Sequence, residues 1–91
     1  MSTLDQIAIR IIKEQELVIG PLAWSEAKKV QGLNITDHEV AFNNGDQKDT
    51  INKLVSQYER LFGRASHEVC KEATTSLIAD LAPAEVPSSL R

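Results

Sequence analysis

Cysteine, aromatic residues and long apolar runs are all scarce in this chain of 91 residues. The single cysteine, Cys70, cannot form an internal disulfide, which fits a reducing compartment. Aromatic residues make up only 4% of the chain, so its core must be largely aliphatic. No apolar run approaches the roughly 20 residues that cross a bilayer, and the N-terminus lacks a charged region followed by an apolar one. We therefore expect a cytoplasmic protein with no membrane partner.

Concentrated positive charge is also missing. The formal net charge is −3, and the longest basic run is Lys28-Lys29. A general nucleic-acid binder needs a basic face that neutralises phosphates, so we expect no nucleic-acid partner. A helical protein that contacts DNA through a local patch around these two lysines is retained as a minor alternative.

Motifs of catalysis and cofactor binding are absent too. Neither a P-loop nor a dinucleotide-binding glycine pattern occurs, and no pair of carboxylates has a recognisable catalytic arrangement. No family motif is recognised. We therefore predict a protein that is not an enzyme, with no catalytic residues, no cofactor and no resident metal.

The first helix is marked by a capping pattern and an apolar stripe. Thr3 and Gln6 have the spacing of a capping box. The stripe that follows has helical spacing and consists of Leu4, Ile7, Ala8, Ile11 and Ile12. The run at residues 17–19 is apolar on several sides, which indicates either a helix end buried between neighbours or a short extended segment.

Gly20-Pro21 then separates the first helix from a second, shorter one. Proline is well tolerated at the first helical position, so this helix is predicted from Pro21 to about Gln31. One of its sides carries Ala23, Ala27 and Val30. Trp24 flanks that side and is either a core residue or an interface anchor.

The connection at residues 34–45 has a weaker pattern. It is either irregular with a short strand near residues 38–43, or a helical turn capped by Thr36 or Asp37. No other segment has the pattern of a strand. A lone strand would therefore have to pair with another chain.

The strongest signal is the amphipathic stretch from Asp46 to Leu81. Its first apolar stripe consists of Ile51, Leu54, Val55, Tyr58, Leu61 and Phe62. At about 100° per residue, Ala65, Val69 and Ala73 continue this stripe beyond Gly63. An interior glycine costs only about 1 kcal/mol relative to alanine. The preserved phase therefore favours one long helix, bent at Gly63, over a helical hairpin.

A continuous helix of this length has a consequence for assembly. It would be roughly 50 Å long, whereas a compact chain of this size has a radius of gyration of about 12 Å. So short a chain cannot cover such a helix, and we predict a homodimer or a complex. The predicted interface consists of Ile7, Ile11, Trp24, Leu54, Tyr58, Leu61, Phe62 and Val69. For Trp24, Tyr58 and Phe62, a place in the core is favoured over a role as interface anchors, because core residues need no special role. A chain that folds back at Gly63 would make a monomeric bundle possible.

The sequence thus predicts an all-α domain at residues 1–82 and a disordered tail at residues 83–91. The expected function is a non-enzymatic cytosolic interaction or regulatory subunit that self-associates through apolar helix faces. The alternative is a small metal or ligand carrier. His67 and Cys70 share a helix face, and two copies of the pair across a dimer would supply the four ligands of a zinc site.

Overall fold

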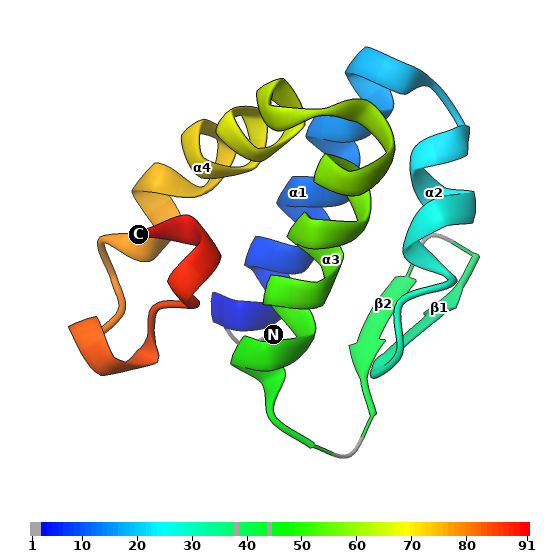
Figure 1. Cartoon of the computed structure of the whole chain (residues 1–91). Coiled ribbons are helices and arrows are strands. Elements are labelled where there is room, and N and C mark those ends of the chain that lie inside the picture. The colour runs from blue at the N-terminus through cyan, green and yellow to red at the C-terminus, as the bar shows by residue number, and fades with distance from the viewer. Residues whose placement is uncertain (1–2, 38, 44) are drawn as a thin grey trace.

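Helices dominate the architecture, as predicted. The computed structural model describes residues 3–37, 39–43 and 45–91 (Figure 1). Along the chain, these residues form α1 (Thr3–Ile19), α2 (Leu22–Ala27), β1 (Leu33–Thr36), β2 (Glu39–Phe42), α3 (Gln47–Phe62), α4 (Arg64–Ile78) and the 3-10 turns η1 (Pro83–Glu85) and η2 (Ser88–Leu90). None of the described helices is long and apolar enough to cross a bilayer.

α1 is the central element, because α2, α3, α4 and β2 all contact it. Its predicted stripe is confirmed: Ile7, Ala8, Ile11 and Ile12 are fully buried. Burial of one such aliphatic side chain contributes about 1.5–3 kcal/mol, so this face anchors the core. Thr3, the expected cap, is the first described residue of the helix.

α2 is shorter than the predicted helix, because it ends at Ala27 rather than near Gln31. After Glu26 the chain tightens, with the amides of Lys29 and Val30 donating to carbonyls three residues back. Ala23 and Ala27 are buried as expected. The Tyr58 hydroxyl donates to the carbonyl of Ala23 over 2.7 Å, which ties α2 to α3.

The predicted connection contains a β-hairpin. β2 matches the expected strand, but it pairs with β1 of the same chain in an antiparallel register. Two cross-strand pairs are apolar, Leu33 with Phe42 and Ile35 with Val40, and β2 contacts α1. The expectation that this strand needs a second chain was therefore wrong. His38, at the edge of the predicted strand, lies outside the described residues.

Gly63 separates two helices and does not merely bend one. Its φ of 90° and ψ of 179° lie in a region that only glycine adopts readily. The Gly63 amide closes the last turn of α3 by donating to the Glu59 carbonyl, and its carbonyl accepts from Ser66 at the start of α4. α3 and α4 then pack against each other. The favoured long helix was wrong, and the chain reverses as in the alternative.

The buried face of α4 explains why the phase argument failed. Ser66, Cys70 and Thr74 are buried at four-residue spacing. The predicted stripe lay one residue earlier, where Ala65 is exposed and Val69 is only half-buried. The break at Gly63 thus rotates the inward face by one position, about 100°.

The overall dimensions follow from this reversal. The radius of gyration is 11.7 Å, and the longest dimension is 32 Å. Ile51, Leu54, Val55 and Tyr58, which the long-helix prediction left to a partner, are at most 1% exposed within one chain. The uncovered helix on which the predicted dimer rested does not exist.

The C-terminal segment also differs from the expected disordered tail. Residues 83–91 form η1 and η2, and η2 packs against α3 and α4. Val86, Pro87 and Leu90 are buried. The packing of this segment was not predicted because its three buried apolar residues stand in a stretch rich in proline and serine, a composition typical of disordered tails.

Gly32 is the glycine at which an added Cβ would meet the closest neighbour. Its φ is 99°, and an added Cβ would lie 2.6 Å from the Thr50 hydroxyl oxygen. We predict that Gly32→Ala lowers the free energy of unfolding by about 2–4 kcal/mol, from backbone strain and overpacking together. Gly20→Ala is the matched control, since its φ is also positive but nothing lies within 4 Å of the added Cβ. Urea unfolding measures both; equal losses would contradict the role of the Thr50 contact.

Candidate functional site

Most of the predicted interface residues lie inside the protein. Ile7, Ile11, Leu54 and Tyr58 are fully buried, and Trp24 is 5% exposed. These five side chains form part of the core. The other three reach the surface: Leu61 is exposed, and Phe62 and Val69 are half-buried.

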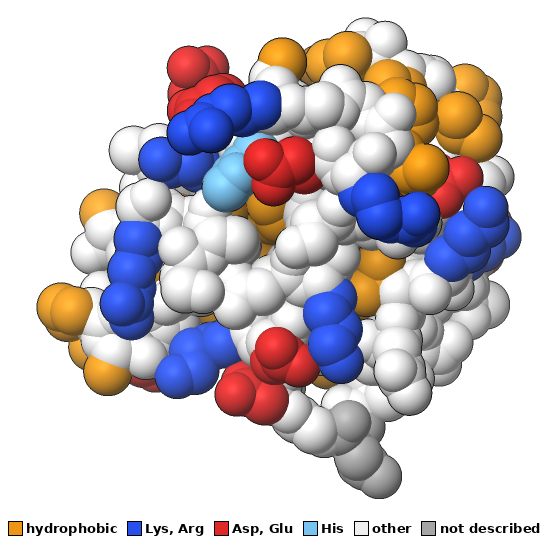
Figure 2. All heavy atoms as spheres, in the orientation of Figure 1, with side chains coloured by type: hydrophobic (Ala, Val, Ile, Leu, Met, Phe, Trp, Pro, Cys, Tyr) orange, Lys and Arg blue, Asp and Glu red, His pale blue; other side chains and the backbone are white. Residues whose placement is uncertain are grey.

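A different set of large apolar side chains is exposed. Leu17 is 81% exposed, Val18 63%, Leu22 46% and Leu61 43%. They come from the end of α1, the start of α2 and the end of α3, and we call them the apolar tip. Figure 2 shows hydrophobic side chains gathered along the corresponding upper edge of the molecule. Exposed apolar groups that cluster in this way mark interaction sites.

The sequence contains a signal for this surface that the prediction missed. At about 100° per residue, Leu17 lies roughly opposite the middle of the stripe of α1, whereas Ile19 lies within it. Ile19 does pack against the core. The helical phase therefore predicts an outward Leu17, but it places Val18 within the stripe, so the 63% exposure of Val18 at the end of α1 is not signalled by the pattern.

A groove between α1 and α4 continues from the apolar tip. Leu17 and Val18 line one wall, and Val69 and Ala73 line the other. Arg10 of α1 donates to the carbonyl of Ala73 over 3.4 Å and so joins the two walls. Of the predicted interface residues, Val69 is thus the one that shares a depression with the newly found apolar side chains.

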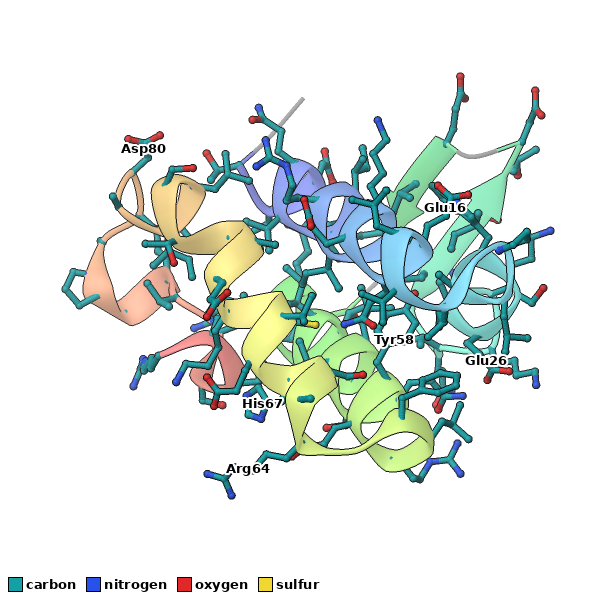
Figure 3. All side chains as sticks on the ribbon, turned by 90° about the horizontal axis from the view of Figure 1, so that it is seen from above. Glu16, Glu26, Tyr58, Arg64, His67 and Asp80 are labelled. Carbon is teal, nitrogen blue, oxygen red and sulfur yellow. The ribbon has the colours of Figure 1, made fainter. Side chains whose placement is uncertain are left out.

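Charges of opposite sign border the tip. Glu16 precedes Leu17 on α1, and Arg64 begins α4 directly after the corner at Gly63. Viewed onto this end of the molecule, Glu16 and Arg64 lie on opposite sides (Figure 3). Glu16 and Arg64 therefore lie at opposite borders of this end, while Arg10, Glu14 and Glu72 line the groove beside it.

His67 has partners at both of its ring nitrogens. Nδ1 lies 3.3 Å from a carboxylate oxygen of Glu59, and Nε2 contacts the backbone carbonyl of Ser89. This arrangement resembles a Glu-His-Ser triad only in composition, because the Ser89 hydroxyl donates to Asn52. His67 therefore cannot take the proton of that hydroxyl, and its role here is to hold the C-terminal segment.

Cys70 does not form a pair of ligands with His67. Its side chain is fully buried between α4 and α1, where the Gln15 amide donates to its Sγ over 3.4 Å. The same amide donates to the Ser66 carbonyl over 3.0 Å. Burial raises the pKa of the Cys70 thiol to about 11. In the part of the chain that the structure describes, no three metal-ligating side chains gather. The two ligands of the predicted carrier site are thus used internally.

Glu26 is the carboxylate with the most enclosed side chain among the ion pairs. It accepts from the Gln57 amide over 2.8 Å and from the Lys29 ammonium over 3.1 Å. These hydrogen bonds lower the pKa of the Glu26 carboxyl. Lys29, considered above as part of a DNA-contacting patch, is thereby paired, and Glu26 connects α2 to α3.

Comparison with protein-family models, curated protein sequences and solved structures finds no match for this chain.

The buried thiol gives a test of the interior. At about pH 8 we predict that Cys70 in the folded protein reacts with iodoacetamide more than 100-fold more slowly than in urea, because burial both raises its pKa and blocks access. The chain has one cysteine, so mass spectrometry follows this site alone. Rates within tenfold of each other would mean that the thiol is accessible.

The single tyrosine gives a second test, by alkaline titration. Burial raises the pKa of Tyr58 above its usual value near 10. A raised folded pKa contributes stability that is fully present below about pH 10 and is lost as the pH rises further. We predict no phenolate absorbance from the folded protein at about pH 10, where the unfolded chain is half ionised. We also predict a smaller alkaline loss of stability in Tyr58→Phe; identical titration of the folded and unfolded protein would contradict the burial.

Proposed function

We propose that this protein is a non-enzymatic interaction protein of the cytoplasm that pairs with a second copy through its apolar tip. The observation that carries the proposal is the exposure of Leu17 and Val18 at 81% and 63%. Water contact with such side chains is unfavourable, and burial against an apolar surface removes it. A lone cysteine buried as a neutral thiol is compatible with a reducing compartment.

A second copy suits this surface because its borders carry opposite charges. In a two-fold dimer, each patch meets itself in the reverse direction. With the axis through the tip, Glu16 of one copy approaches Arg64 of its partner, and the pair occurs twice. The charges thus favour one orientation, while the apolar side chains supply most of the affinity.

The proposed pairing replaces self-association through the predicted helix faces. Those faces of α1 and α3 are already buried within one chain, so they are accessible only after unfolding. Of the originally expected interface, Leu61 and Val69 remain at or beside the proposed surface. The area is small, so the dimer belongs to the class of weak, reversible interfaces.

Replacement of the apolar tip tests the proposal. Leu17→Gln with Val18→Gln keeps good helix formers but removes the apolar surface. We predict that the wild type approaches twice the 10.1 kDa chain mass as its concentration rises from micromolar to millimolar, whereas this double variant stays monomeric. Sedimentation equilibrium measures the masses. Lys13→Gln, at another exposed position of α1, is the matched control and should dimerise as the wild type does.

Charge-reversal variants test the proposed orientation of the two copies in the dimer. Glu16→Arg and Arg64→Glu should each weaken the dimer a few-fold, and the combination should recover most of the loss, because rim ion pairs contribute about 0.2–1 kcal/mol. A wild type that stays monomeric throughout, or a Leu17/Val18 variant that dimerises equally well, would overturn the proposed function.

A further inference from the structure

The C-terminal segment, residues 83–91, lies on the opposite side of the molecule from the apolar tip (Figure 1). We call it the strap. It leaves the end of α4 and returns so that η2 packs against both α3 and α4. Val86 is 8% exposed and Leu90 5%, and Pro87 between them is fully buried. A short extended segment thus inserts three apolar side chains into a groove between two helices.

Side chains of both helices bind the backbone of the strap. Asn52 of α3 accepts from the Ser89 amide over 3.0 Å and from the Ser89 hydroxyl over 2.6 Å. His67 of α4 contacts the carbonyl of the same residue, and Lys48 donates to the Ala84 carbonyl over 2.9 Å. Recognition of backbone N–H and C=O groups between apolar pockets is how extended peptides are bound.

The strap is largely self-contained apart from these contacts. Its turns close internally, with Val86 donating to Pro83 and Leu90 to Pro87. Residues 79–82 connect it to the end of α4. None of the groove contacts described above depends on that covalent connection. A separate peptide with the same side chains could make all of them.

An open hollow of about 560 Å³ lies between the strap and the end of α4. It is lined by Ile78 of α4, by Leu81, and by Pro83 and Val86 of the strap itself, among others. A larger apolar side chain in place of Val86 would therefore gain contacts without displacing the core.

We propose that the groove between α3 and α4 is a peptide-binding site that the strap occupies in cis. Its ligand is a segment of another protein with an apolar residue, proline, any residue, serine and an apolar residue in succession, the pattern of Val86 to Leu90. The strap competes with that ligand and so keeps the site closed until the ligand is abundant. Tethering gives the strap a high effective concentration, so a free peptide must bind more tightly or be in excess.

The test uses the full chain and a fluorescent peptide with the sequence of residues 82–91. Val86→Asp with Leu90→Asp prevents the chain's own strap from docking, because a buried unpaired carboxylate is strongly unfavourable. We expect the peptide to bind this variant at least tenfold more tightly than the wild type in fluorescence anisotropy. Ala84→Asp with Ser88→Asp changes two exposed strap residues and is the matched control, which should behave as the wild type does.

Specificity is checked with altered peptides and an altered groove. A peptide that carries the Val86 and Leu90 aspartates should not bind, and one with leucine in place of Val86 should bind more tightly. Adding Asn52→Ala to the strap variant should weaken binding about tenfold, since two hydrogen bonds to the ligand are lost. This dependence would show that the side chains of the strap and the groove, and not the covalent connection, determine binding.

Circular dichroism establishes that the strap variant is folded. If it is not, Ser89→Pro, which removes the Ser89 amide and hydroxyl donors but keeps the apolar anchors, takes its place with the same expected binding. No saturable binding to a folded variant at millimolar peptide, or equal binding of the aspartate peptide, would overturn the proposal. Leu17→Gln with Val18→Gln should leave peptide binding unchanged, so this test and that of the dimer fail independently.

Discussion

The reversal of the chain at Gly63 is the constraint on which the rest of the structure depends. Because Gly63 adopts a φ of 90° with an extended ψ, α3 can end and α4 can begin within a single residue. α4 then packs against α1 while α3 covers another part of the same helix. If α3 and α4 formed one straight helix, they could not both pack against α1, and part of the apolar face of α1 would be exposed. The core of a chain this small exists because one residue permits the turn.

The sequence correctly predicted those elements of the fold that depend on residues close to one another in the chain. The stripe of α1 is a repeated three- and four-residue spacing, and its burial is confirmed. The amphipathic stretch was predicted to begin at Asp46, and Asp46 does cap α3 by accepting from the amides of Lys48 and Asp49. Pro21 likewise marked the start of α2, because an N–H group at the beginning of a helix has no partner within the helix and its loss is harmless.

The parts that were wrong depend on contacts between distant residues. Gly63 in a continuous helix and Gly63 at a corner differ by little in local energy, and the outcome is decided by packing of α4 on α1. Small and polar residues on α4 look unlike a core stripe, yet Ser66, Cys70 and Thr74 permit close approach to Gln15. β1 was missed because four residues with two apolar side chains give no signal until a partner strand is known. The strap was missed because the residues that bind its backbone at Ser89, Asn52 and His67, are far from it in sequence.

The contacts between distant residues also determine which apolar surfaces remain exposed for interactions. A chain of this size buries a limited fraction of its surface, so apolar groups left outside are costly and informative. They remain outside at the apolar tip, where α1, α2 and α3 end. On the side of α3 and α4 away from the tip, the strap packs against both helices and buries Val86, Pro87 and Leu90. The apolar tip and the groove between α3 and α4 share no residue, so occupation of one leaves the other free. The proposed self-association at the tip and the proposed exchange of the strap would therefore not compete with each other.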